Sequence, residues 1–162
     1  MTISVGDKLP AATFRYMSED GPASHSTSDL TTGKKIVIFA LPGAYTGTCS
    51  TAHMPSFVRN ADAIRAKGVN GIYCLAVNDI FVMQSWAKEL EADTAGISML
   101  SDGDGSYTAE IGFDFSALPV GLIGRSKRYS MIVEDGVVTA LNEEKNPGVC
   151  DISGGETILD QL

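Results

Sequence analysis

KKIVIFA, residues 34–40, is the stretch that indicates the fold most strongly. It is short, rich in β-branched side chains and apolar at consecutive positions, which is typical of a strand buried on both faces. A Pro42-Gly43 break follows it, and a second run of this kind, GIYCLAV, occupies residues 71–77. Residues 48–66, between the two runs, carry apolar side chains at helical spacing. We therefore predict a strand–helix–strand unit, whose crossover implies two parallel strands.

The chain after the second strand predicts five more elements. They are a helix over 80–92 capped by Asp79, a strand over 97–100, a brief helix near 107–111, a hairpin turning at Glu134-Asp135-Gly136, and a C-terminal helix opened by a Ser153–Glu156 capping box. Residues 18–29 and 113–124 are expected to be irregular loops. This order predicts an α/β, thioredoxin-like fold, in which helices flank a central mixed β-sheet with N-terminal and C-terminal additions. One domain is expected to span residues 1–162.

Composition and charge exclude several classes of protein. The 162 residues include 12 basic and 20 acidic side chains, and the net charge of −8 argues against binding to nucleic acid or an anionic membrane. The longest apolar run, residues 36–41, is too short to span a bilayer. Residues 1–20 lack the pattern of a secretory signal. These features together favour a cytoplasmic protein.

Three cysteines, Cys49, Cys74 and Cys150, are too few for a disulfide framework. No CxxC pair and no Cys/His pair at zinc-finger spacing occurs, so we expect no metal site. In a reducing compartment a cysteine either packs in the core or does chemistry, and packing is the commoner case.

Cys49 is the cysteine whose position suggests chemistry. We expect it in the first turn of the helix that follows the buried strand, where free N–H groups and the helix dipole favour a thiolate. Thr46, three residues earlier, can offer a hydroxyl to the sulfur or to an incoming oxygen. Because residues 36–58 contain no Lys or Arg, cationic help must come from elsewhere, and the basic cluster at residues 125–128 could fold back beside Cys49. Two plainer interpretations stay open, a packing cysteine and a solvated basic loop.

The segment LPGAYTGTCSTAHMPSF, residues 41–57, resembles the active-site stretch of the peroxiredoxins, which are thiol peroxidases of the AhpC/TSA-like group. It is most similar to the type II, or peroxiredoxin-5, subfamily, whose pattern is P-G-A-F-T-P-T-C-S-x-x-H-x-P. The segments VNDIFVMQSWAK, RSKRYSMIVEDG and VVTALN resemble the same subfamily in the same order, so the resemblance covers residues 3–162. Gly47 replaces the usual proline and is expected to loosen the turn, whereas Tyr45 replaces phenylalanine conservatively.

The resemblance implies a function and four catalytic residues. The protein would reduce hydrogen peroxide and organic hydroperoxides, in antioxidant defence and redox homeostasis, without metal, haem or flavin. Cys49 would be the peroxidatic cysteine that becomes a sulfenic acid, and Thr46 would hydrogen-bond the peroxide. Pro42 would shield the sulfenate, and Arg128 would stabilise the thiolate and polarise the peroxide. Fixed donors of this kind also fit the chemistry, because negative charge builds up on the leaving oxygen.

The resemblance leaves the reductant and the resolving residue open. Cys150, in a loop, and Cys74, in a predicted strand, are both candidates to form a disulfide with Cys49. Cys74 has packing as its plainer interpretation, since a strand cysteine would need local unfolding to reach its partner. Alternatively neither resolves, and glutathione or a glutaredoxin attacks the sulfenate directly. The reductant of the full cycle is expected to be glutathione with a glutaredoxin, or thioredoxin. The resemblance also implies a homodimer formed through the active-site end of the fold.

Two other functions are weighed against the peroxidase. One is a redox sensor that uses Cys49 oxidation as a signal without efficient turnover. The other is a thiol hydrolase acting through Cys49 and His53, although a structural histidine is the more common case. The complete set of Pro42, Thr46, Cys49 and Arg128 favours the peroxidase, because a sensor would not need all four.

Overall fold

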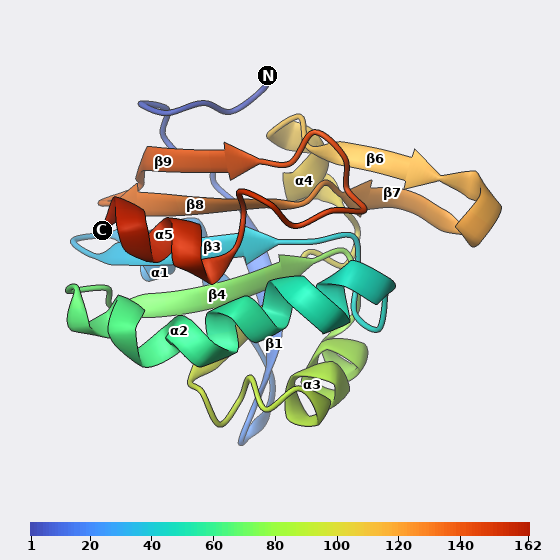
Figure 1. Cartoon of the computed structure of the whole chain (residues 1–162), viewed down its shortest axis with the longest axis horizontal. Helices are drawn as coiled ribbons and strands as arrows, with labels where there is room; N and C mark the ends of the chain where they lie inside the picture. The colour runs from blue at the N-terminus through green and yellow to red at the C-terminus, as the bar shows by residue number, and fades with distance from the viewer.

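The computed structural model describes residues 1–162, and a seven-stranded mixed sheet forms its centre (Figure 1). The strand order is β2-β1-β5-β4-β3-β8-β9. Strands β3, β4 and β5 are parallel, as the strand–helix–strand unit predicts, and β1, β2, β8 and β9 add antiparallel edges. The strands are β1 (Thr13–Ser18), β2 (Gly21–Ser26), β3 (Lys35–Ala40), β4 (Gly71–Ala76), β5 (Ile97–Ser101), β8 (Tyr129–Glu134) and β9 (Val137–Glu143).

Helices cover both faces of this sheet. In Figure 1, α2, α3 and α5 lie in front of the sheet, and α1 and α4 lie behind it. The helices are α1 (Thr27–Thr31), α2 (Met54–Ala66), α3 (Ile80–Glu89), α4 (Ser106–Glu110) and α5 (Gly155–Gln161). Asp79 caps α3 as expected, since its carboxylate accepts hydrogen bonds from the first backbone N–H groups of that helix. The structure thus has the mixed α/β, thioredoxin-like architecture that the sequence predicts.

Strand β3 shows why the opening stretch is apolar at consecutive positions. Val37 and Phe39 join the core on the side of α2, α3 and α5, whereas Ile36 and Ile38 join the core on the side of α1 and α4. All four are fully buried. Successive side chains of a strand point to opposite faces, so a strand between two helical layers must be apolar on both.

Residues 113–124 are not an irregular loop, and this expectation is wrong. They lie in a separate hairpin of β6 (Asp114–Ala117) and β7 (Leu122–Ser126), joined by a 3-10 turn over Leu118–Val120. The hairpin projects from the end of the main sheet, at the right of Figure 1. Apolar and polar residues alternate only over the short run FDFSA (113–117), and the second strand, LIGRS (122–126), has no alternation, so the sequence does not reveal the pair as a hairpin.

Residues 18–29 are also more regular than expected. They contain β2, which pairs only with β1 at the edge of the sheet, and the start of α1, where Ser26 and Asp29 form a capping box. An edge strand with polar, partly exposed side chains lacks the apolar pattern by which strands are recognised.

The C-terminal capping box is wrong as well. Helix α5 begins at Gly155, its N-cap is Gly154, and no side chain caps it. Ser153 instead donates from its backbone N–H and its hydroxyl to the carboxylate of Glu144. Because Glu144 holds both the backbone N–H and the hydroxyl of Ser153, neither group is available for the reciprocal contacts of a capping box with Glu156.

Candidate active site

The register of two strands brings the end of β3 and the start of β8 together. These strands are antiparallel neighbours, and Ala40 pairs with Tyr129. The residue just before β8, Arg128, therefore lies at the carboxyl end of β3, where the chain turns toward Cys49. The Nη2 atom of Arg128 donates to Sγ of Cys49 at 3.1 Å. Strand pairing thus joins two residues that are 79 positions apart in the sequence.

Cys49 lies in a widened helical turn rather than a regular α-helix. Residues Cys49–His53 form a π-helix, which leads directly into α2. The sequence suggests a kink at Pro55, because proline lacks a backbone N–H. In the structure the π-turn runs without a break into α2, and Pro55, the second residue of α2, lacks the N–H that would bond a carbonyl of that turn, so the irregularity lies directly before the proline. π-turns of this kind are frequent at functional sites.

Arg128 is 1 % exposed, and its guanidinium is held by three partners. It donates to Sγ of Cys49, to Nδ1 of His53 at 2.9 Å and to the carbonyl of Pro147 at 3.0 Å. None of the four ion pairs in the structure includes Arg128. A buried cation is costly unless an anion compensates it, and the only contacting group that can become an anion is the Cys49 thiol. The site therefore places a buried positive charge directly against the sulfur of Cys49.

His53 is a neutral side chain that connects Arg128 to the backbone carbonyl of Ser153 by hydrogen bonds. Its Nε2 lies 3.0 Å from the carbonyl oxygen of Ser153, so Nε2 carries the proton and Nδ1 accepts from Arg128. Burial, together with the positive charge of Arg128, lowers the pKa of His53 to about 3. Both ring nitrogens are thus occupied, and neither hydrogen-bonds to Cys49. This arrangement does not support a hydrolase in which His53 takes the proton of the Cys49 thiol.

The loop before Cys49 is held in place by its own backbone contacts. The Thr46 hydroxyl donates to the carbonyl of Gly43 at 2.8 Å. The carbonyl of the buried Pro42 accepts from Nη1 of Arg125 at 3.1 Å. A Cβ atom at Gly43 would lie 2.4 Å from that nitrogen, so glycine allows the close approach. Arg125, a member of the basic cluster at residues 125–128, thus fixes the loop that carries Pro42.

The two other cysteines lie in different surroundings. Cys74 is fully buried in the central strand β4, and burial raises the pKa of its thiol well above the ordinary value. Cys150 is half-buried in a loop, and its sulfur lies 3.7 Å from the Ser153 hydroxyl. Burial also raises the pKa of Cys150. All three cysteines are free thiols in this structure.

Residues 145–153, which we call the Cys150 loop, cover the site. The carbonyl of Pro147 accepts from Arg128, the carbonyl of Gly148 accepts from the Thr48 hydroxyl at 2.7 Å, and the carbonyl of Ser153 faces His53. Cys49 is fully buried beneath these contacts. This role of the loop cannot be read from the sequence, because the contacts use backbone carbonyls that have no sequence signature.

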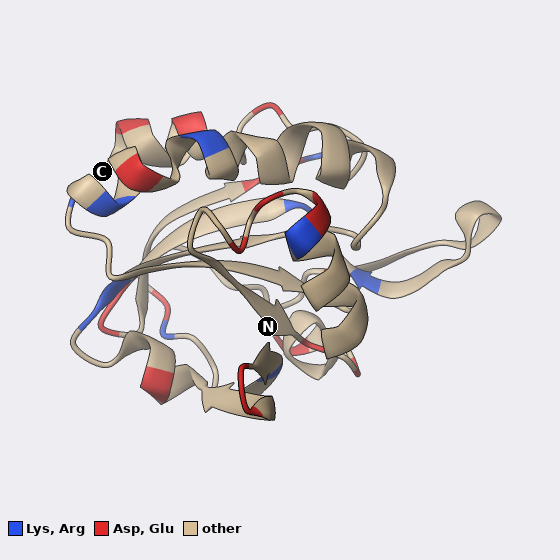
Figure 2. Cartoon of the chain, turned by 90° about the horizontal axis from the view of Figure 1, so that it is seen from below, with Lys and Arg blue, Asp and Glu red and all other residues tan.

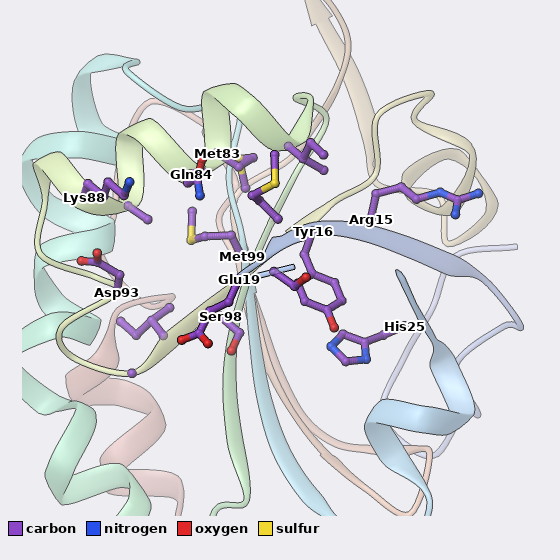
Figure 3. Close-up of a pocket in the computed structure, with 16 residues that line it drawn as sticks. Arg15, Tyr16, Glu19, His25, Met83, Gln84, Lys88, Asp93, Ser98 and Met99 are labelled. Atoms are coloured by element: carbon purple, nitrogen blue, oxygen red, sulfur yellow. The ribbon is translucent and has the colours of Figure 1, made fainter. Parts of the chain in front are cut away.

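A sizeable cavity lies away from this site. It has a volume of about 650 Å³ and is lined by residues of β1, β2, α3 and β5, including Tyr16, His25 and Met83 (Figure 3). Neither Cys49 nor Arg128 lines it.

No cluster of three or more His, Cys, Asp or Glu side chains is arranged to hold a metal ion. No helix has the length and apolar character needed to cross a membrane.

Comparisons with known proteins agree with this geometry. The Redoxin family model matches residues 4–159. The chain is 44 % identical to peroxiredoxin-2E, chloroplastic, of Arabidopsis thaliana, over 99 % of this chain and 70 % of the relative. It is 45 % identical to peroxiredoxin-2F, mitochondrial, of Oryza sativa, over 83 % of this chain and 67 % of the relative. The crystal structure of reduced Prx3 in complex with H2O2 from Vibrio vulnificus superposes with a TM-score of 0.92 at 43 % identity, covering 99 % of both chains.

The thioredoxin-like fold and the contact between Arg128 and the Cys49 thiol define a thiol redox protein, and the chain belongs to the Redoxin family. Within that class, the chain belongs to the type II peroxiredoxins. It is accordingly a thiol peroxidase, an antioxidant oxidoreductase that reduces peroxides through a peroxidatic cysteine and uses thiol reductants. The sensor alternative is not favoured.

One expectation is overturned by the same comparisons. The charge and the lack of a secretory signal favoured a cytoplasmic protein. The relatives that share 44–45 % identity with the chain are named chloroplastic or mitochondrial, which contradicts that expectation. Net charge reflects solubility and association rather than compartment, and so it was a poor guide.

Proposed function

We propose that Cys49 is the peroxidatic cysteine and that it reduces hydrogen peroxide and small organic hydroperoxides. The observation that carries this proposal is the contact between Nη2 of Arg128 and Sγ of Cys49, made by a buried cation that has no carboxylate partner. The thiolate attacks one peroxide oxygen, so an S–O bond forms and the O–O bond breaks. The sulfur is oxidised to sulfenic acid, and the leaving oxygen takes up a proton and departs as water or an alcohol.

Three further residues act around the reacting atoms in this proposal. Arg128 stabilises the thiolate and the charge that develops on the leaving oxygen. The hydroxyl of Thr46 turns from the Gly43 carbonyl to hydrogen-bond the bound peroxide. Pro42, buried and held through its carbonyl by Arg125, limits the access of solvent to the sulfenate. The complex of the Vibrio vulnificus relative with H2O2 supports the choice of substrate.

The test is intact-mass analysis and peptide mapping after one equivalent of hydrogen peroxide. The wild-type protein is compared with Cys49→Ser, Cys74→Ser and Cys150→Ser. We expect Cys49 to be consumed within seconds in every protein that retains it. If Cys49 of the wild type stays a thiol for many minutes, the assignment is wrong.

Cys150 is the stronger internal candidate to resolve the sulfenate. It lies in the loop that contacts Arg128 and Thr48, whereas Cys74 is fully buried in a central strand and would need that strand to open. The peptide map decides among the remaining choices. A Cys49–Cys150 disulfide supports Cys150, a Cys49–Cys74 disulfide supports Cys74, and a persistent sulfenate supports glutathione, a glutaredoxin or thioredoxin as the attacking thiol.

We also propose that the chain acts as a single domain that forms a homodimer through the end of the fold that carries the site. Large apolar side chains are exposed on the β6–β7 hairpin, at Leu118, Val120 and Ile123. Figure 2 shows that the hairpin beyond its base carries no Lys, Arg, Asp or Glu, although charged residues are spread over the rest of the chain. An exposed apolar arm without charges is typical of an interface between protein chains.

A further inference from the structure

Glu144 is a buried carboxylate that the proposed chemistry does not use. It directly follows β9 and is 4 % exposed. Its Oε1 accepts from the backbone N–H groups of Asp151, Ile152 and Ser153 at 2.7, 2.7 and 2.9 Å, and from the Ser153 hydroxyl at 2.9 Å. Glu144 takes part in none of the ion pairs. Three consecutive N–H groups that converge on one oxygen form an anion-binding turn, and the carboxylate fills it.

The segment held by Glu144 continues the hydrogen bonds of the active site. The carbonyl of Ser153 accepts from Nε2 of His53 at 3.0 Å, and Nδ1 of His53 accepts from Arg128 at 2.9 Å. Arg128 in turn donates to Cys49 at 3.1 Å. An unbroken series of hydrogen bonds thus connects the carboxylate of Glu144 to the sulfur.

Glu144 and Arg128 hold the two sides of the Cys150 loop. Arg128 binds the carbonyl of Pro147 on one side of Cys150, and Glu144 binds the N–H groups of residues 151–153 on the other. The backbone of Glu144 also donates to the carbonyl of Arg128 at 3.0 Å. Two buried side chains therefore fix the Cys150 loop: Glu144 binds its backbone N–H groups, and Arg128 binds one of its backbone carbonyls.

We propose that Glu144 is a positioning residue of the peroxidase site: its carboxylate fixes Ser153, and through Ser153 and His53 it orients the guanidinium of Arg128 on Cys49. This inference rests on the proposed function of Cys49. Glu144 touches neither the sulfur nor the peroxide. Its effect on the reaction comes from holding a donor at the right distance and angle, to which charge-stabilising groups are sensitive.

The matched variants are Glu144→Leu, Glu144→Gln and Glu143→Gln. Leucine removes the acceptor, and glutamine keeps an acceptor oxygen but loses the charge. Glu143→Gln removes the same charge from the neighbouring residue, which forms a partly exposed ion pair with Lys127. Circular dichroism establishes that each variant is folded, and Glu144→Gln carries the test if Glu144→Leu does not fold.

The first readout is the imidazole of His53 by ¹⁵N NMR, which a generally destabilising change would not alter in the folded protein. The chain has two histidines, so His25 serves as a reference in the same spectrum. In the wild type we expect His53 as the neutral tautomer with a protected Nε2–H. In Glu144→Leu we expect that proton to exchange faster and the ring to titrate at higher pH, with Glu144→Gln intermediate and Glu143→Gln unchanged.

The second readout is the rate constant for the reaction of Cys49 with hydrogen peroxide. We expect Glu144→Leu to lower it on the order of tenfold and Glu143→Gln to leave it unchanged. A folded Glu144→Leu protein with the wild-type His53 spectrum, or with the wild-type rate, overturns the proposal. Failure of Cys49 to react in the wild-type protein would refute the proposed function instead, and it is recognised because Cys49 of the unmodified chain then stays a thiol, with neither a sulfenate nor a disulfide formed.

Discussion

Arg128 combines full burial with a positive charge, and its planar group is what makes three contacts possible at once. The sulfur of Cys49, the ring of His53 and the carbonyl of Pro147 lie at three different nitrogens of the guanidinium. A lysine ammonium is a compact charge on a flexible stem and cannot meet three partners in this fixed fork. These three contacts therefore need an arginine at position 128, and not merely a positive charge.

We predict that Arg128→Lys slows the reaction of Cys49 with hydrogen peroxide by about 10²–10³-fold, the typical effect of losing one aligned charge-stabilising donor. Stopped-flow fluorescence can follow the reaction, because the indole N–H of the buried Trp86 donates to the hydroxyl of Ser50, next to Cys49. Lys127→Arg, which keeps a cation one position away, serves as the control. An Arg128→Lys protein that reacts at the wild-type rate would contradict this role for the guanidinium.

The stability of the protein should depend on pH through His53. The folded pKa is about 3, below the ordinary value of 6.5, so between these values the unfolded chain binds more protons. The free energy of unfolding therefore falls as the pH falls from 6.5 toward 3, by at most about 1.4 kcal/mol per pH unit. The contribution is fully present above pH 6.5.

We expect urea unfolding at pH 7 and pH 5 to reveal this dependence. The wild type should lose about 2 kcal/mol more than His53→Gln over this interval, because glutamine cannot take up the proton. His25→Gln, on strand β2, is the control and should behave as the wild type. Parallel losses in the wild type and His53→Gln would show that His53 is not the group responsible.

At the scale of elements, the helix that carries Cys49 begins with an uncommon residue. Gly47 stands where the subfamily pattern has proline, and the helical winding starts at this residue. A Cβ atom at this position would meet nothing within 4 Å, and the backbone does not adopt a left-handed conformation. The first position of a helix suits proline, since its N–H has no intrahelical acceptor and its φ is already helical.

Gly47→Pro should therefore stabilise the protein by about 0.4–1 kcal/mol, chiefly by reducing the conformational freedom of the unfolded chain. Thermal unfolding measures this effect, with Gly47→Ala expected to give a smaller gain in the same direction. A fall in Tm for the proline variant would mean that the turn before the helix needs the freedom of glycine.

At the scale of the whole molecule, the main sheet forms the site, whereas the β6–β7 hairpin presents an exposed apolar surface. The sheet holds both cores and brings the end of β3 to the start of β8, which creates the site. The β6–β7 hairpin extends beyond the sheet with apolar side chains in solvent (Figure 1). Nothing within the chain covers these side chains, so an association with a second copy would bury them.

We predict that Val120→Asp combined with Ile123→Asp converts a wild-type dimer into a monomer. Both side chains are about 70 % exposed, so the fold should be little affected, whereas a charge in an apolar interface is costly. Sedimentation velocity measures the oligomeric state. Val5→Asp, which changes another exposed side chain on the N-terminal segment, is the control. A wild type that sediments as a monomer would contradict the proposed homodimer.

Local patterns determined the central part of this protein from the sequence alone. The burial of a strand on both faces is visible in KKIVIFA and GIYCLAV, and a strand end followed by a Pro42-Gly43 break and a helix start marks the place of Cys49. Elements that bury little surface, such as β2 and the β6–β7 hairpin, have no such pattern and were predicted as loops. The sequence alone left the basic cluster at residues 125–128 open between a solvated loop and a group folded back beside Cys49, and the resemblance to a family assigned the role to Arg128.

Only the tertiary structure decided what surrounds the thiol. The register of β3 against β8 carries Arg128 to Cys49, and the Cys150 loop supplies backbone carbonyls to Arg128 and His53. The same three-dimensional arrangement takes Ser153 out of its expected capping box and assigns it to Glu144. The physical reason is that hydrogen bonds depend on distances across the fold, whereas a sequence pattern reports only the periodicity of neighbouring residues.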